Sequence, residues 1–339
     1  MMEPRLGMGF EMLKIGGVMH PSRAVVAPMA GVTDRPFRDL CRQFGSFWLV
    51  AEMLTSDQTL WNTSKSRLRR IHADEPSPRW VQIAGSDPQT LALAGLANER
   101  AGAQILDINM GCPAKKVCNK AAGSALLRDE TLVANILGEV CRAVSIPVTL
   151  KYRLGWSKQE QNAVTVAKIA QDAGIQALSV HGRTRACRFE GLVDYDAIAQ
   201  VKSAVSIPVI ANGDICSPEQ ARSVIDRTGA DAVMVGRAVQ GRPWLPADID
   251  AYLNGNTNPI ERSFDEKCDA MLGHLLALHE FYGEAQGVRI ARKHAGWFFA
   301  ANLNAHTAAR RTFNQITGAA EQIDFLTAIK RTAGNKVAA

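Results

Sequence analysis

The chain has 339 residues, of which 47% are hydrophobic, and a formal net charge of +6 at pH 7. This length allows one barrel with a smaller appendage and excludes a small module held together by disulfides. The seven cysteines form no Cys-x-x-Cys pair, so neither a disulfide framework nor a zinc site is expected. The sequence shows neither an 18-residue apolar run nor a signal peptide. We therefore expect a metal-free cytoplasmic protein that enters no membrane.

Eight short apolar runs recur along the chain, and a helical pattern follows most of them. This alternation is typical of a (β/α)8 TIM barrel, an α/β fold, whereas a doubly wound sheet rarely has eight such units in one run. We expect the strands at residues 24–27, 48–52, 80–84, 104–109, 147–152, 177–181, 208–212 and 231–236. Helices are expected between them at residues 36–44, 88–101, 130–143, 159–173, 195–204 and 218–228.

The pattern changes at both ends of the predicted barrel. We expect residues 1–12 to form a flexible leader and residues 13–253 to form the barrel, with a hairpin at 13–20 covering its bottom. A polar linker at 254–259 precedes a C-terminal all-helical bundle domain at 260–332, with helices at 268–281 and 318–329.

Polar residues at the carboxyl ends of the predicted strands define a candidate site, because barrel enzymes carry their chemistry at that edge. Cys112 follows a buried strand in the sequence Asp107-Ile-Asn-Met-Gly-Cys-Pro-Ala-Lys-Lys116. Gln82 ends an apolar strand and needs a partner, either a neighbouring loop or a ligand. Lys151 places a cation in a low-dielectric pocket, which favours an anion there unless Glu52 forms an internal ion pair with it.

The last two strands end in sequences that favour phosphate binding. Asn212-Gly-Asp214 and Gly236-Arg237 occupy the two loops that form a phosphate site in many barrels. No Gly-x-Gly-x-x-Gly follows the first strand and no P-loop motif occurs, so a Rossmann dinucleotide site is not indicated. The expected ligand is a mononucleotide-like cofactor or a phosphorylated substrate.

Five ordered motifs give the chain a family resemblance. The motifs are Ala27-Pro-Met-Ala-Gly-Val-Thr-Asp34, Asn109-Met-Gly-Cys-Pro-Ala-Lys-Lys116 with Gly123-Ser-Ala-Leu-Leu127, His181-Gly-Arg-Thr-Arg185, Asn212-Gly-Asp-Ile215, and Gly236-Arg-Ala-Val-Gln-Gly-Arg-Pro-Trp244. With the C-terminal Arg289-Ile-Ala-Arg-Lys-His294, the chain resembles the tRNA-dihydrouridine synthases, most closely their bacterial B subgroup, over about residues 13 to 330.

The resemblance implies an enzyme that uses FMN, with NADPH (or NADH) as reductant, to reduce a D-loop uridine of tRNA, position 17, to 5,6-dihydrouridine. Hydride would pass from flavin N5 to uracil C6, and Cys112 would protonate C5. Lys115 and Lys116 lie close in sequence and favour the thiolate, so their side chains should point away. The implied cofactor-binding residues are Pro28, Met29, Ala30, Gln82, Lys151, His181, Asn212, Gly213, Asp214, Gly236 and Arg237.

Basic residues predict a surface for the tRNA. Residues 287–317 contain no Asp or Glu, and aromatic residues are interleaved with the cations there. The alternative for this segment is a helical pair with a solvated basic face. We expect a monomer whose tRNA contacts are made by Asn109, Lys115, Lys116, Arg183, Arg289, Arg292, Lys293, Arg310 and Arg311.

The sequence leaves three alternative functions. The principal alternative is an FMN-dependent barrel oxidoreductase that acts on a free small molecule and does not need a basic appendage. A non-catalytic RNA-binding protein would leave Cys112, Lys151 and Gln82 clustered without a reason, and a flavin-free isomerase would be colourless. RNA binding and a flavin spectrum separate these possibilities.

Overall fold

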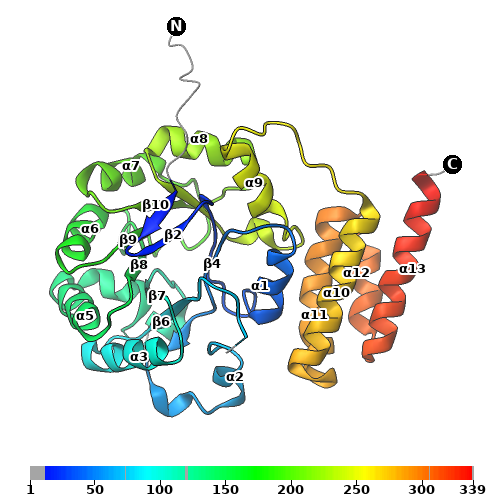
Figure 1. The fold of residues 1–339 in the computed structure, drawn as a ribbon, viewed down its shortest axis with the longest axis horizontal. Helices are drawn as coiled ribbons and strands as arrows, with labels where there is room; N and C mark the ends of the chain where they lie inside the picture. The colour runs from blue at the N-terminus through cyan, green and yellow to red at the C-terminus, as the bar shows by residue number, and fades with distance from the viewer. Residues whose placement is uncertain (1–11, 73, 119–120, 305, 338–339) are drawn as a thin grey trace, which may run out of the picture.

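The computed structural model describes residues 12–72, 74–118, 121–304 and 306–337. Figure 1 shows a ring of strands and helices beside a separate group of four helices, α10 to α13. The predicted flexible leader, apart from Met12, lies outside the described residues.

Parallel strands form the wall of the barrel. Their order is β4-β3-β11-β10-β9-β8-β7-β6-β5, and the isolated parallel bridge between Val50 and Trp80 joins the two ends of this order into a closed ring. The strands are β3 (Ala24–Val26), β4 (Trp48–Leu49), β5 (Leu54–Thr55), β6 (Trp80–Ala84), β7 (Ile105–Met110), β8 (Val148–Arg153), β9 (Ala177–His181), β10 (Val209–Asn212) and β11 (Ala232–Val235). The predicted (β/α)8 barrel is confirmed.

The second predicted strand, at 48–52, is wrong as a continuous element. It is interrupted after β4, bridges to Trp80 through Val50, and resumes as β5. In the interruption, the carboxylate of Glu52 accepts a hydrogen bond from the Gly31 amide. The break thus places a buried acid against the loop that follows β3.

The predicted hairpin covers the amino-terminal end of the barrel. Strands β1 (Leu13–Ile15) and β2 (Val18–His20) pair antiparallel, and Leu13 and Ile15 pack with apolar residues of the barrel interior. The turn residue Gly16 has φ of +58°, and an added Cβ there would lie 2.5 Å from Pro147 Cγ, just before β8 begins. Only glycine fits this position.

Helices surround the barrel and mostly begin where the sequence predicts. The cap residues of four of them, Asp34, Asp87, Asp129 and Ser217, accept backbone N–H groups of the first turn. The bounds are α1 (Arg35–Arg42), α2 (Ser64–Arg67), α3 (Pro88–Arg100), α4 (Lys115–Cys118), α5 (Glu130–Ala143), α6 (Ala163–Asp172), α7 (Tyr195–Ala204), α8 (Pro218–Thr228) and α9 (Leu245–Leu253), with short 3-10 helices η1 (Gln58–Leu60), η2 (Gly123–Arg128) and η3 (Arg237–Val239).

One helix starts later than predicted. Helix α6 begins at Ala163 instead of residue 159, because the preceding segment turns back on itself through a bridge between Gly155 and Gln161. Gly155 has φ of +150°, and a Cβ there would lie 2.2 Å from the Glu160 carbonyl oxygen, so the turn requires glycine.

The C-terminal helices form a bundle with its own apolar core. They are α10 (Phe264–Tyr282), α11 (Glu284–Asn302), α12 (His306–Gln315) and α13 (Ala319–Val337). A capping box between Ser263 and Glu266 starts α10 before the predicted residue 268. Phe298, Phe299 and Phe313 are buried in the bundle core, as the interleaved aromatic residues predict.

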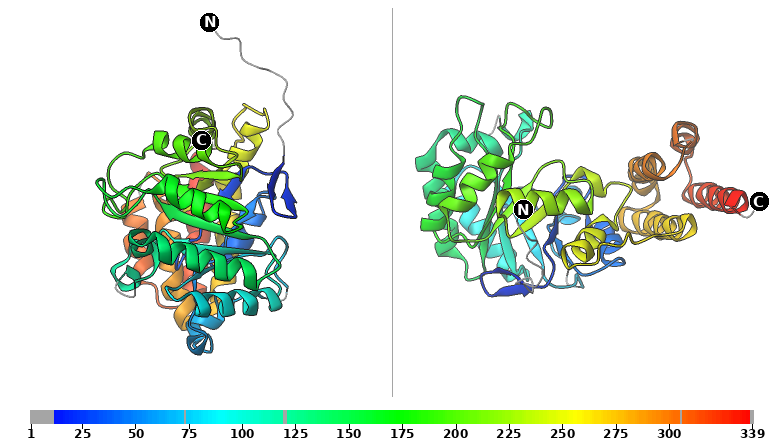
Figure 2. Two further views of the ribbon diagram at one scale, coloured as in Figure 1. Left: turned by 90° about the vertical axis from the view of Figure 1, so that its left-hand side faces the viewer. Right: turned by 90° about the horizontal axis from the view of Figure 1, so that it is seen from above.

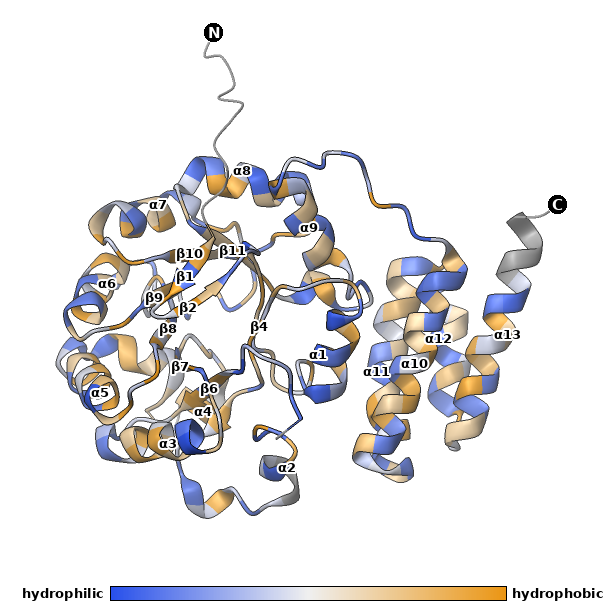
Figure 3. Cartoon of the chain, viewed as in Figure 1, coloured by the Kyte–Doolittle hydropathy of each residue, from blue (hydrophilic) through white to orange (hydrophobic). Residues whose placement is uncertain are grey.

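The bundle lies beside the barrel and contacts it through α1. The right-hand view of Figure 2 shows the same arrangement, and Figure 3 shows that the linker between α9 and α10 is mainly hydrophilic. The apolar core of the bundle also includes Trp244 from the segment that follows β11. Within the described residues, we find no helix with the length and apolarity needed to span a bilayer.

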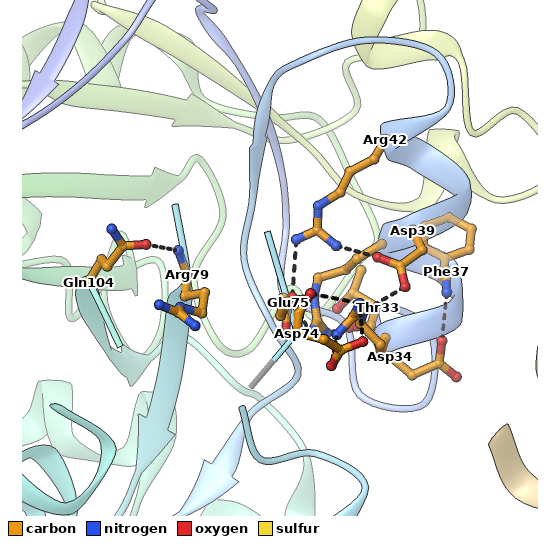
Figure 4. A network of polar contacts seen from close by, with 11 residues as sticks. Thr33, Asp34, Phe37, Asp39, Arg42, Asp74, Glu75, Arg79 and Gln104 are labelled. Carbon is orange, nitrogen blue, oxygen red and sulfur yellow. Dashed lines mark hydrogen bonds and ion pairs between the residues drawn. The ribbon is translucent and has the colours of Figure 1, made fainter. Parts of the chain in front are cut away.

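A buried ion pair anchors α1 to the segment before β6. Arg38 donates two hydrogen bonds to the carboxylate of Glu75, at 2.7 and 2.6 Å, and a third to the carbonyl of Thr33. Figure 4 shows Arg42 reaching the same Glu75 and also Asp39. Arg38 and Glu75 are both buried, so loss of Arg38 would leave the Glu75 carboxylate with only the more exposed Arg42 as its partner.

We predict that Arg38→Met destabilises the barrel by about 3–5 kcal/mol, the usual cost of breaking a buried pair. The control Arg227→Met removes the exposed pair with Asp196 and should leave the unfolding midpoint close to that of the parent. Urea unfolding followed by circular dichroism measures both. Equal midpoints for the two variants would show that the Arg38–Glu75 pair does not anchor α1.

Candidate active site

A cavity of about 1060 Å³ lies at the carboxyl ends of the barrel strands. Cys112, Asn109 and every residue predicted to bind the cofactor line it. The eight strand ends therefore bring together residues that are up to 209 positions apart, from Pro28 to Arg237. The structure thus shows these residues together at one mouth of the barrel, as predicted.

A chain of hydrogen bonds holds the backbone of Cys112. The side-chain oxygen of Asn109 accepts the Gly111 and Cys112 amides at 3.1 and 2.9 Å. The Asn109 amide nitrogen donates to Gln82 Oε1 at 2.8 Å, and Gln82 Nε2 donates to Asp107 Oδ2 at 2.7 Å. Gln82 thus finds its partners inside the barrel. Asn109 lines the cavity and also holds the backbone of Cys112, so its predicted contact with the substrate stays a prediction.

The other side of the Cys112 loop is held equally firmly. Ser124 donates from both Oγ and the backbone amide to the Cys112 carbonyl, at 2.9 and 3.1 Å. Arg153 Nε donates to the Gly111 carbonyl at 2.8 Å. In the sequence, Arg153 is recognisable as a cation at the end of β8. Its role is not, because it depends on carbonyl groups of loops that are distant in the chain.

The Cys112 thiol is suited to remain protonated at neutral pH. Burial is the largest effect on Cys112 and raises its pKa above the ordinary value, while the nearby Arg153 and Lys151 oppose this effect. A protonated thiol in a cavity can act as a general acid. The predicted orientation of Lys115 and Lys116 cannot be assessed, because their side chains lie outside the described part of the chain.

Lys151 contributes a cation to the cavity, and Glu52 is not its partner. Its ammonium donates to Asn212 Oδ1 at 3.1 Å, and Asn212 donates in turn to the Met234 carbonyl. Glu52 instead pairs with Arg69 at 3.1 Å. Burial, assisted by Arg153, lowers the pKa of Lys151 to about 8, so the group is mainly cationic at pH 7.

The loops after β10 and β11 contain a tight network of charges. Arg183 donates to both oxygens of Asp214 and to the Glu190 and Gly191 carbonyls, and Arg237 also pairs with Asp214, at 2.8 Å. Arg183 is buried and bonded to protein groups, an arrangement that does not favour its predicted contact with tRNA. The Asp214 carboxylate holds the two arginines, which leaves only its backbone to face a phosphate.

The glycines predicted to approach a phosphate occupy crowded positions. Gly213 has φ of +138°, and a Cβ there would lie 2.8 Å from Val193. Gly236 lines the cavity beside Arg237, whose side chain is 54% exposed and thus accessible to an anion. His181 adds no charge here, because burial lowers its pKa well below the ordinary value. These donors fit a ligand with an anionic group near β10 and β11.

The basic residues of the bundle divide into two groups. Arg289, Arg310 and Arg311 are exposed and available to a polyanion. Arg292 is half-buried and donates to the Ile316 carbonyl, and Lys293 donates to the Gly31 carbonyl of the barrel. The prediction that Arg292 and Lys293 contact phosphate does not fit these internal bonds, which hold helices and loops together.

No group of three or more His, Cys, Asp or Glu side chains placed to hold a metal occurs within the residues that the structure describes. What the cavity does contain is a half-buried thiol, a lysine cation and glycines beside Arg237, at the mouth of a parallel barrel. Such a lining fits a barrel enzyme and has room for a ligand with an anionic group beside a protonated thiol.

Comparison with known proteins identifies the family. The family model described as dihydrouridine synthase (Dus) matches residues 25–334, and the chain belongs to this family. The chain is 59% identical to tRNA-dihydrouridine synthase B of Pseudomonas aeruginosa over 304 residues, covering 90% of this chain and 91% of the relative. It is 54% identical over 317 residues to the protein of the same name from Vibrio vulnificus, covering 93% and 97%. The resemblance seen in the motifs is confirmed.

We predict that the affinity for reduced FMN, used as the probe because its ring is anionic, falls about tenfold between pH 7 and pH 9. A group with a pKa of about 8 is only about one-tenth protonated at pH 9, and an anion bound beside Lys151 favours the protonated form. Fluorescence titration measures the affinity. In Lys151→Met the affinity should be lower and independent of pH over this range, whereas the exposed control Lys168→Met should behave like the parent. A pH dependence that survives in Lys151→Met would contradict this assignment.

Proposed function

We propose that this chain is a tRNA-dihydrouridine synthase that reduces a D-loop uridine of tRNA, position 17, to 5,6-dihydrouridine. The proposal depends on one observation. A protonated Cys112 and a cationic Lys151 line the same cavity, beside glycines that leave room for an anion. Family membership and the printed names of the relatives support the same reaction. We also propose that the protein is a cytoplasmic monomer with tRNA as its partner.

The cavity suits FMN as the cofactor. The backbone of Gly213, Asp214 and Gly236, together with the Arg237 side chain, would hold its phosphate. Pro28, Met29 and Ala30 line the same cavity next to Gly236, and the ring edge would lie along them. Lys151 would stand beside the electron-accepting side of the ring, where a cation stabilises negative charge. When bound, FMN supplies redox chemistry by taking two electrons from NADPH or NADH and delivering them as hydride to uracil C6.

Cys112 completes the reduction by donating a proton. Addition of hydride at C6 and of this proton at C5 balances the two-electron reduction of the C5–C6 double bond, and solvent then reprotonates the thiolate. The bonds from Asn109, Ser124 and Arg153 fix the Cys112 backbone, so the thiol keeps one position over the cavity.

A uridine in folded tRNA must leave its stack to enter this cavity, so contacts outside the pocket have to hold the RNA. The exposed Arg289, Arg310 and Arg311 of the bundle supply such contacts, and Lys115 and Lys116 beside the Cys112 loop remain predicted contacts. A small-molecule oxidoreductase, the principal alternative, would not need the basic bundle.

We predict that Cys112→Ala keeps NADPH oxidation through FMN but lowers dihydrouridine formation at least about 100-fold, because only the proton donor is removed. Dihydrouridine in isolated tRNA is measured by mass spectrometry. The control Cys141→Ala removes a thiol on α5 away from the cavity and should retain activity. Parental activity in Cys112→Ala would assign Cys112 to packing.

We predict that replacing Arg289, Arg310 and Arg311 together by Met weakens tRNA binding and reduces its salt dependence. Each lost phosphate contact should lower the slope of log affinity against log salt by about 0.7–0.9. Filter binding at several salt concentrations gives the slope, and FMN affinity should stay at the parental value. Arg142→Met removes a comparably exposed arginine from α5 and serves as the control. An unchanged slope in the triple variant would mean that the barrel loops alone hold the RNA.

A further inference from the structure

The loop at residues 28–34, here called the pocket loop, separates the cavity from the bundle. On one side, Pro28, Met29, Ala30 and Val32 line the cavity. Within the loop, the Met29 amide donates to Thr33 Oγ1 at 2.9 Å, and the Val32 and Thr33 amides return to the Met29 carbonyl. These bonds make the pocket loop a compact turn. Contacts on its outer side therefore bear on the residues that line the cavity.

Gly31 carries the outer contacts of the pocket loop. Its N–H donates to the Glu52 carboxylate, and its carbonyl accepts from the Lys293 ammonium of α11. Gly31 has φ of +75°, and a Cβ there would lie 3.4 Å from Lys293 Nζ. Both backbone groups of one residue in a left-handed conformation are thus bonded to charged side chains.

A second contact joins the bundle to the end of the same loop. The Tyr282 hydroxyl at the end of α10 donates to Asp34 Oδ2 at 2.7 Å. The other oxygen of Asp34 accepts the Phe37 amide at 3.0 Å and so caps α1. Asp34 is only 2% exposed, and burial raises its pKa to about 6 while these two donors oppose that rise.

The charges around the pocket loop balance only when the bundle is in place. Asp34 and Glu52 are both buried carboxylates. Arg69 pairs with Glu52 at 3.1 Å, and Lys293 interacts electrostatically with both acids. Burial lowers the pKa of Lys293, and the two carboxylates raise it. Without Lys293, two buried anions would share one arginine, an arrangement that is costly in a low dielectric.

We propose that Lys293 and Tyr282 are positioning residues through which the bundle fixes the pocket loop and thereby shapes the cofactor cavity. This inference rests on the proposed function, because it treats the cavity as the FMN site. In this proposal Lys293 supports the cavity wall from outside. Arg289, one helical turn earlier on α11, faces solvent and the RNA.

Lys293→Met is the primary test, made in the full-length protein with Arg289→Met as the matched control from the same helix. Loss of the ammonium should free the Gly31 carbonyl and loosen the pocket loop. We expect faster hydrogen exchange of the amides at residues 31–34 and FMN affinity lowered roughly tenfold, the effect of losing one charge-assisted hydrogen bond. The salt slope of tRNA binding should remain at the parental value.

Arg289→Met should show the opposite behaviour, with a smaller salt slope and unchanged FMN affinity and exchange. Lys293→Arg keeps a cationic donor and should restore most of the FMN affinity. Tyr282→Phe removes a single hydroxyl and should speed exchange at Asp34 and Phe37. It supplies the test on its own if Lys293→Met does not fold.

The inference is overturned if the loop exchange and FMN affinity of Lys293→Met equal those of the parent, or if its salt slope falls as in Arg289→Met. In the second case Lys293 is a phosphate contact after all. A parent protein that binds no FMN would refute the proposed function instead, and the exchange measurements would still decide whether Lys293 and Tyr282 hold the loop.

Discussion

The position of the Cys112 thiol depends on one chain of hydrogen bonds through the barrel interior, from Asp107 through Gln82 and Asn109 to the Cys112 amide. The parallel register places Gln82 opposite Asp107, so the pairing of β6 with β7 sets where this chain of hydrogen bonds begins. Each member is buried, and an unpaired buried polar group costs about 1–3 kcal/mol. A shift of one strand would break several of these bonds at once. The loop that carries Cys112 therefore takes its geometry from the barrel wall.

The same burial decides the protonation states in the cavity. It raises the pKa of Cys112 and lowers those of Lys151 and His181, each time favouring the neutral form. Because Lys151 starts from a high ordinary value, it stays mainly cationic at pH 7, whereas the imidazole becomes neutral. The result is a proton donor in the same cavity as a lysine cation. Burial raises the pKa of Asp107 to about 6, so this carboxylate is still mainly ionised at pH 7; it interacts electrostatically with Lys151, and its oxygens accept hydrogen bonds from Thr149 and Gln82.

The barrel and the gathering of the site residues could be predicted from the sequence, because apolar runs and Gly or Pro breaks are local signals. The partners of the charged residues could not. Glu52 was the natural partner for Lys151 by strand position, yet the break in the second strand turns it to Gly31 and Arg69. Arg183 follows β9 among basic residues and was assigned to RNA, but the neighbouring Asp214 and two loop carbonyls bury it. Such outcomes depend on how distant loops meet above the strands.

Helix α11 shows why a basic segment cannot be divided by periodicity alone. Residues four apart lie on nearly the same face of a helix, about 6 Å apart along its axis, so Arg289 and Lys293 are equivalent in the sequence pattern. What separates them is where the barrel ends. Lys293 lies over the pocket loop and its two buried acids, while Arg289 lies beyond that contact in solvent. One turn of a single helix thus spans the change from a cation that neutralises the protein interior to one available for RNA. Helix α11 therefore joins a surface that is available to RNA to the loop that lines the cavity.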